Sequence, residues 1–221
     1  MMRLLLTAVL TSVLAIAGAG RASDATTTTP GQPPTIVVLG DSLSAAYGFA
    51  QADGWVALLQ ERLRTRGLDF AVINAGISGD TTAGGLTRLP ALLARHRPAL
   101  LLIELGANDG LRGLKTEVLR ENLTRMVQLG QAAGSQVLLI GIRLPPNYGA
   151  AYERAFQAVF QEVAAAHGVP LLPSLLEGVA EDRGLMQADE IHPTAAAQPR
   201  ILENVWPMLA PLLSATQPKN D

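Results

Sequence analysis

Hydrophobic residues follow two alternating patterns along the chain. Short apolar runs bounded by turn residues are typical of strands that are buried on both faces of a sheet. These runs cover residues 36–39, 70–73, 100–105, 137–140 and 169–172. Longer segments with apolar residues at helical spacing lie between and after them. The expected helices span residues 55–66, 82–94, 116–133, 151–166 and 194 to about 213.

This alternation predicts an α/β protein with one parallel sheet. Crossovers between parallel strands are almost always right-handed, so the helices should cover both faces of the sheet. We therefore expect a three-layer, doubly wound, flavodoxin-like domain over residues 35–215, with no internal repeat and no second domain. In open α/β sheets the chemistry lies at the carboxyl ends of the strands. The residues that follow each apolar run are therefore the candidates for function.

The amino-terminal region differs from this domain. Residues 1–22 combine a short positive start, an apolar stretch from Leu4 to Ile16 and a small-residue cleavage site. The stretch is short for a membrane span, so it predicts a cleaved secretory signal peptide, with an uncleaved anchor as the alternative. Residues 23–34 are rich in threonine and proline and predict a disordered linker. We expect a periplasmic or secreted protein without a stable membrane anchor, and a flexible tail at residues 216–221.

Composition narrows the function classes. The chain of 221 residues has no cysteine, which excludes disulfides, a lipid-modified cysteine and a cysteine-based metal site. Its formal net charge of −2 gives no indication of the basic surface that binds nucleic acid. Hydrophobic residues make up 48% of the chain and aromatic residues 4%, which predicts a large aliphatic core. We expect a monomer that acts on a small molecule and needs no metal or other cofactor.

Ser42 is the candidate nucleophile. It lies in the segment Gly40-Asp41-Ser42-Leu43-Ser44, directly after the first apolar run. A serine is a weak nucleophile until a base removes its proton, so this interpretation requires a histidine and a carboxylate elsewhere in the chain. The G-x-S-x-G elbow of the α/β-hydrolases does not occur in the sequence.

His192 is the candidate general base. His96 and His167 fall at the ends of expected helices, where an imidazole complements the helix dipole, so both are predicted to be structural. His192 lies between elements and follows Asp189 by three residues. That spacing can aim Asp189 at one ring nitrogen and leave the other for Ser42. The alternative is that Asp189 caps the following helix and His192 is incidental.

Gly79 and Asn108 follow two further apolar runs and are candidate donors to an oxyanion. Together with the backbone N–H of Ser42, the Gly79 N–H and the Asn108 amide would form a three-donor oxyanion hole. Alternatively, Gly79 is a plain turn glycine and Asn108 begins an Asn-Asp-Gly turn. Asp41 and Asp109 lie at strand-to-loop junctions, where we expect them to accept backbone N–H bonds rather than to react.

Together, these segments resemble the blocks of the GDSL, or SGNH, hydrolase family over residues 36–192. The matching positions are residues 40–44, Gly79, residues 106–109 and residues 189–192. The resemblance implies Ser42 as nucleophile, His192 as base, Asp189 as the carboxylate that orients it, and Ser42, Gly79 and Asn108 as oxyanion donors. Residues 77–81, 110–114 and 142–149 are most similar to the periplasmic acyl-CoA thioesterase/lysophospholipase and arylesterase group of the family.

The resemblance implies an exported esterase that hydrolyses carboxylic esters and thioesters, including lysophospholipids, through an acyl-enzyme. Leu111, Leu144 and Pro145 fall in two loops that should flank the nucleophile, so we expect them to line an apolar acyl channel. The alternative is that these side chains plug the core. Acyl-CoA belongs to the cytoplasm, so lysophospholipids and small esters fit an exported enzyme better.

Three other functions stay open on the sequence. A metal-dependent phosphohydrolase could use side chains of one sheet edge as ligands, namely Asp41, Asp109, Asp189 and His192. An exported binding protein without catalysis would leave the serine and histidine idle. A carbohydrate O-deacetylase could use the same fold and the same residues on acetylated sugars.

Overall fold

The computed structural model describes residues 32–216, so the predicted signal peptide, most of the linker and nearly all of the tail lie outside the described residues. All five strands are parallel and form one sheet. The strands are β1 (Thr35–Gly40), β2 (Ala71–Gly76), β3 (Leu100–Glu104), β4 (Gln136–Ile140) and β5 (Leu171–Leu172). Their order is β2-β1-β3-β4-β5, which is the flavodoxin-like order of a doubly wound sheet. The predicted fold class is confirmed.

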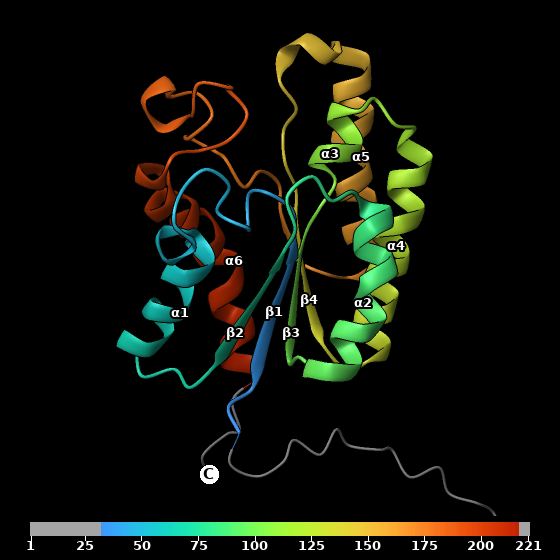
Figure 1. Cartoon of the computed structure of the whole chain (residues 1–221). Coiled ribbons are helices and arrows are strands. Elements are labelled where there is room, and N and C mark those ends of the chain that lie inside the picture. Colours follow the sequence, from blue (N-terminus) through green and yellow to red (C-terminus); the bar gives the residue numbers. More distant parts are fainter. Residues whose placement is uncertain (1–31, 217–221) are drawn as a thin grey trace, which may run out of the picture.

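Helices cover both faces of the sheet and make it the middle of three layers (Figure 1). The α-helices are α1 (Trp55–Thr65), α2 (Thr82–His96), α3 (Ala107–Leu111), α4 (Thr116–Ala132), α5 (Ala150–His167) and α6 (Gln198–Thr216). Short 3-10 helices are η1 (Gln51–Asp53), η2 (Pro146–Tyr148), η3 (Arg183–Leu185) and η4 (Ala195–Ala197). Helices α1 and α6 pack on one face, and α2, α4 and α5 on the other. No described helix has the length and apolar character needed to cross a membrane.

The core forms where the apolar runs predicted it. Residues 36–39 of β1 and all of β3 are buried, because both strands lie inside the sheet and helices cover both of its faces. Helix α1 buries Trp55, Leu59 and Leu63, which lie four residues apart and so share one face of the helix. The apolar runs of β1 and β3 therefore placed the centre of the core correctly, whereas β2, at the edge of the sheet, is only partly buried.

Several elements differ from the predicted bounds. Strand β5 has two residues instead of the four expected over 169–172, because Pro170 and Pro173 lack the N–H that a ladder needs. Strand β2 continues to Gly76, and α6 begins at Gln198 after the short helix η4. Helix α3 was not predicted, since its sequence contains a turn signal.

The strand order brings the candidate segments together. Strands β1 and β3 are neighbours, although β2 separates them in sequence, and the direction of winding reverses between them. Such a switch point opens a crevice at the carboxyl ends of the two strands. Ser42 follows β1 and Asn108 follows β3, so both lie at the carboxyl ends of these two strands.

Candidate active site

The turn after β1 presents Ser42 at the end of the strand. Asp41 is fully buried, and its Oδ1 accepts the backbone N–H of Leu43 at 3.0 Å. The carbonyl of Asp41 accepts the N–H of Ala45 at 3.0 Å. Ala46 has a φ of 61°, a left-handed conformation that turns the chain back toward α1. As predicted, the Asp41 carboxylate supports the backbone beside Ser42.

Ser42, His192 and Asp189 form a continuous hydrogen-bonded chain. The Nε2 atom of His192 lies 2.9 Å from the Oγ of Ser42, and its Nδ1 lies 2.7 Å from Oδ2 of Asp189. Oδ1 of Asp189 accepts the N–H groups of Ile191 and His192, each at 3.0 Å. Glu190, with a φ of 56°, makes the turn that allows these bonds. The structure thus brings together the three residues named from the sequence as catalytic.

Local contacts hold the segment that carries His192. The N–H of Gln187 donates to the carbonyl of His192 at 2.7 Å, and the N–H of Thr194 donates to the carbonyl of Leu185 at 2.7 Å. The ring of Tyr47 packs on the imidazole with 4.4 Å between ring centroids. The sequence analysis did not include Tyr47, which lies five residues after Ser42. These contacts fix the plane of the ring that faces Ser42.

The Asp189 carboxylate stays ionised at neutral pH. Partial burial opposes its ionisation, but hydrogen bonds from the backbone and ring of His192 and from the backbone of Ile191 outweigh that cost and lower the pKa of Asp189 to about 2. An anion beside Nδ1 favours the tautomer that carries its proton there. The Nε2 atom is then free to accept the proton of Ser42.

The candidate oxyanion donors Gly79 and Asn108 lie at the same end of the sheet. Gly79 has a φ of 78°, which glycine adopts at no steric cost. Asn108 lies in helix α3 rather than in a loop. Its Nδ2 donates to the carbonyl of Asp80 at 2.9 Å and to Oδ2 of Asp41 at 3.1 Å. The contact to Asp41 is the longer of the two. To donate to an oxyanion, the amide would have to turn one hydrogen away from Asp41.

A second carboxyl group, that of Glu104, lies beneath the nucleophile turn. Its Oε2 accepts the hydroxyl of Ser44 at 2.7 Å and the N–H of Asp41 at 3.3 Å. Burial, together with the charge of Asp41, raises the pKa of Glu104 well above its ordinary value, so a neutral acid is favoured there. The sequence analysis missed Glu104, although a single charged residue inside an apolar run was a usable signal.

Substitution Asp41→Asn is expected to stabilise the protein increasingly as the pH rises. Burial raises the pKa of Asp41 from 3.8 to about 6, because the hydrogen bonds from Leu43 and Asn108 offset only part of the desolvation. The folded protein thus binds this proton more tightly than the unfolded chain. The stability that protonated Asp41 contributes is fully present below pH 3.8 and is lost as the pH rises through about 6. The advantage of Asp41→Asn should grow by on the order of 2–3 kcal/mol over this interval. Urea unfolding at several pH values measures it, and a difference that stays constant with pH would contradict the assignment.

The other polar residues named from the sequence have structural contacts. Oδ2 and Oδ1 of Asp109 accept the N–H and hydroxyl of Thr82 at 2.9 and 2.5 Å, as expected for a carboxylate that supports backbone. His96 and His167 are the last residues of α2 and α5, which confirms their predicted helix-end positions. Within residues 32–216, histidine and acidic side chains form no group of three or more that could hold a metal ion.

The three residues predicted to line an acyl channel occupy different environments. Leu144 is only 5% exposed and packs on Gly110, where an added Cβ would lie 2.5 Å from the leucine side chain. It is therefore a core residue in this structure, as the alternative interpretation held. Leu111 and Pro145 are partly exposed. The hydroxyl of Tyr148 donates to the carbonyl of Leu111 at 3.0 Å and holds that segment in place.

Sequence comparison assigns the family. The GDSL-like lipase/acylhydrolase family matches residues 38–199, a range that contains every candidate catalytic residue. The chain belongs to this family and is an ester hydrolase. It is 59% identical over 179 residues to Esterase TesA of Pseudomonas aeruginosa, covering 81% of this chain and 89% of that protein. It is also 44% identical over 180 residues to thioesterase 1/protease 1/lysophospholipase L1 of Escherichia coli K12, covering 81% of this chain and 85% of that protein.

Solved structures agree with this assignment. The crystal structure of TesA superposes with a TM-score of 0.80 and covers 80% of this chain and 99% of that one, at 59% identity. The psychrotrophic esterase EstA from Pseudoalteromonas sp., solved in a form inhibited by monoethylphosphonate, has a TM-score of 0.78. It is 42% identical, and the match covers 81% of this chain and 98% of that one.

Proposed function

We propose that this ester hydrolase is an exported serine esterase that cleaves carboxylic esters and thioesters through an acyl-enzyme on Ser42. The observation that carries the proposal is the hydrogen-bonded chain from Ser42 Oγ through the His192 ring to the Asp189 carboxylate. A serine with a histidine base, itself oriented by a carboxylate, is the arrangement that activates a hydroxyl for acyl transfer.

In the proposed catalytic cycle, His192 carries every proton transfer. Nε2 of His192 takes the proton from Ser42 Oγ as that oxygen attacks the carbonyl carbon of the substrate. The same nitrogen returns the proton to the leaving alcohol or thiol, and an acyl ester of Ser42 remains. Water then attacks this ester with His192 again as base, and His192 returns the proton to the Oγ of Ser42 as the acid product leaves. Asp189 stabilises the imidazolium that forms in both steps.

Charge on the carbonyl oxygen would be held by the backbone N–H groups of Ser42 and Gly79 and by the Asn108 amide. These donors lie on three segments that follow β1, β2 and β3, and they converge at one end of the sheet. Backbone donors fixed by the fold need no reorganisation as charge develops, whereas the Asn108 amide has to exchange its contact to Asp41 for the oxyanion.

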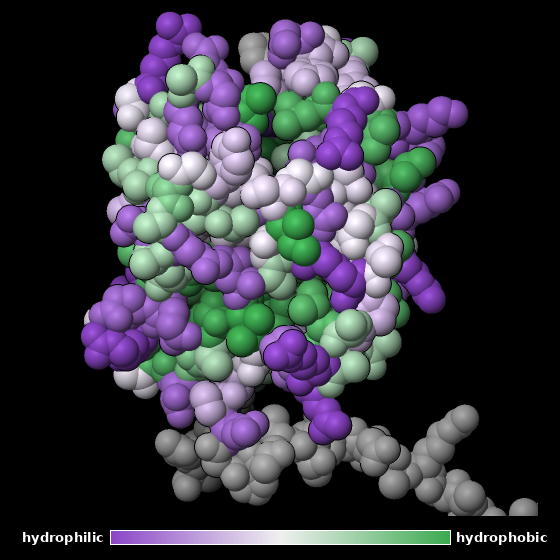
Figure 2. All heavy atoms as spheres, in the orientation of Figure 1, coloured by the Kyte–Doolittle hydropathy of each residue, from purple (hydrophilic) through white to green (hydrophobic). Residues whose placement is uncertain are grey.

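The substrate class is a small molecule with an apolar acyl group. Exposed apolar side chains occur in the segments that carry the site, including Tyr47 beside His192, Ile77 before Gly79, and Ile191. Figure 2 shows hydrophobic residues between hydrophilic ones near the top of the molecule, above the strand ends in Figure 1. We propose Leu111 and Pro145 as further acyl contacts. The names of the relatives, esterase and thioesterase/lysophospholipase, support esters, thioesters and lysophospholipids.

We also propose that the protein acts as a monomer in the periplasm or outside the cell. The support for export is the sequence of residues 1–22, with its positive start, apolar stretch and small-residue cleavage site. The proposed mechanism requires no cofactor, since the base, the nucleophile and the oxyanion donors are all protein groups.

Labelling with a fluorophosphonate tests the mechanism directly. The mature protein and His192→Ala are treated with the reagent, and mass spectrometry locates the adduct. We expect an adduct on Ser42 in the unaltered protein and its near-complete loss in His192→Ala, because the serine is then no longer activated. Labelling of another residue, or equal labelling of Ser42 in the variant, would overturn the mechanism.

A further inference from the structure

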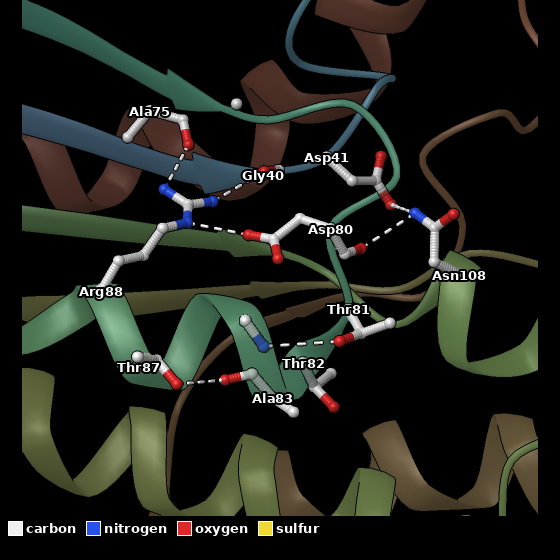
Figure 3. A network of polar contacts seen from close by, with 12 residues as sticks. Gly40, Asp41, Ala75, Asp80, Thr81, Thr82, Ala83, Thr87, Arg88 and Asn108 are labelled. Carbon is white, nitrogen blue, oxygen red and sulfur yellow. Dashed lines mark hydrogen bonds and ion pairs between the residues drawn. The ribbon is translucent and has the colours of Figure 1, made fainter.

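Arg88 of helix α2 links the ends of β1 and β2 to the loop that follows β2. Its Nη2 donates to the carbonyl of Gly40 at 3.0 Å, and its Nη1 to the carbonyl of Ala75 at 2.6 Å. Its Nε donates to Oδ2 of Asp80 at 2.8 Å. Figure 3 shows this guanidinium between the two strand ends and the Asp80 carboxylate. One side chain thus contacts three segments beneath the candidate site.

The contacts continue from Asp80 to the candidate oxyanion donors. Asp80 directly follows Gly79, so fixing its side chain also limits the movement of the Gly79 peptide. The carbonyl of Asp80 accepts one hydrogen of the Asn108 amide at 2.9 Å, as Figure 3 shows. Because that hydrogen is anchored, the other one points toward Oδ2 of Asp41, whose backbone adjoins Ser42. The position of Asp80 therefore determines the direction of the Asn108 donor.

The ion pair between Arg88 and Asp80 is largely buried, and a glycine leaves space for it. The side chains of Arg88 and Asp80 are only 20% and 12% exposed, so solvent screens their attraction less than at the surface. Gly84 leaves room for the Asp80 carboxylate, since an added Cβ at Gly84 would collide with Oδ1 of Asp80. The planar guanidinium with its fixed fork of donors can reach three acceptors at once, whereas a lysine ammonium is a point charge on a flexible stem.

We propose that Arg88 is a positioning residue that sets the geometry of the oxyanion hole by holding Asp80, and through it Gly79 and Asn108. The inference rests on the proposed function, because it assigns to Gly79 and Asn108 the role of oxyanion donors. Arg88 contacts no reacting atom; it acts through the segments it joins. A donor displaced by about 1 Å can lower a rate by ~10²-fold, which sets the scale of the expected effect.

The first test compares Arg88→Ala and Arg88→Lys with Arg95→Ala, an exposed arginine two turns further along α2. We expect Arg88→Ala to lower kcat for a p-nitrophenyl ester by ~10- to 100-fold with little change in KM. Arg88→Lys should recover only a small part of the loss, and Arg95→Ala should match the unaltered protein. Circular dichroism and Tm identify variants that fail to fold. A folded Arg88→Ala with unchanged kcat would overturn the inference.

Two further variants separate positioning from a general loss of stability. Gly84→Ala adds a good helix former yet pushes the Asp80 carboxylate away, so kcat should fall although both charges remain. The double variant of Arg88→Ala with Asn108→Ala should lose less than the product of the two single losses, because both changes act on one donor. Multiplicative losses, or an unaffected Gly84→Ala, would overturn the inference. Fluorophosphonate labelling of Ser42 in the unaltered protein and in His192→Ala tests the proposed function separately.

Discussion

Replacing Ser42 with alanine is expected to lower kcat for a p-nitrophenyl ester by about 10⁶-fold, the scale seen when other Ser–His–Asp hydrolases lose their nucleophile. The Oγ of Ser42 forms the covalent bond to the acyl group, and the 2.9 Å contact to His192 gives its proton a defined acceptor. Without the hydroxyl, only attack by water remains. Steady-state kinetics with enough enzyme to resolve a residual rate measures the loss.

A double variant of Ser42→Ala with His192→Ala tests whether the two residues act together. Ser42 and His192 act as one unit, so removing both should cost little more than removing either alone. Ser214→Ala provides the matched control, since Ser214 is an exposed serine on α6 whose hydroxyl contacts only the carbonyl of Ala210 among the described residues. That control should leave kcat unchanged. A Ser42→Ala protein with substantial ester hydrolysis would show that the chemistry occurs elsewhere.

Asn108→Ala is expected to lower kcat by ~10²- to 10³-fold, the usual cost of losing one oxyanion donor. The effect should fall on kcat more than on KM, because the amide stabilises charge that exists only in the transition state. In the free protein this amide donates to Asp80 and Asp41, so substrate has to compete with Asp41 for one hydrogen. Kinetics on a short-chain ester measure both constants.

Asn204 provides the matched comparison for Asn108. Its amide also donates to two acceptors, the carbonyls of Leu175 and Glu177 at 2.9 and 2.8 Å, but these lie outside the site. Asn204→Ala should lower Tm and leave kcat unchanged well below the unfolding temperature. Equal effects of the two substitutions on kcat would mean that Asn108 supports the fold and donates nothing to the substrate.

The sequence predicted the sheet and its helices because burial imposes a pattern on neighbouring positions. The run at 100–105 became β3, and the spacing of Trp55, Leu59 and Leu63 became the buried face of α1. It also predicted the pairing of Asp189 with His192, which are three residues apart. Those predictions depend on local spacing, which a single sequence displays directly.

Contacts between distant residues were harder to predict. Arg88 contacts Gly40, which is 48 positions away, and its place on α2 has no special local pattern. Leu144 was assigned to a channel because its neighbours predict a loop, yet it lies against Gly110 in the core. Helix α3 was missed because Asn-Asp-Gly also forms turns. For Arg88 and Leu144, the contact partner belongs to another element.

The hydrogen-bonded segment of residues 185–194, which carries His192, determines which catalytic distances change when the site is perturbed. Asp189 and His192 share one short stretch whose ends are joined by the bonds between Gln187 and His192 and between Thr194 and Leu185. Asp189 and His192 therefore move together as one rigid unit, while Ser42 belongs to the turn that follows β1. Heating or mutation that shifts this unit changes one catalytic distance, from Nε2 to Oγ, and leaves the other intact. The alignment of the three residues Ser42, His192 and Asp189 thus depends mainly on the one contact that joins two separate parts of the chain.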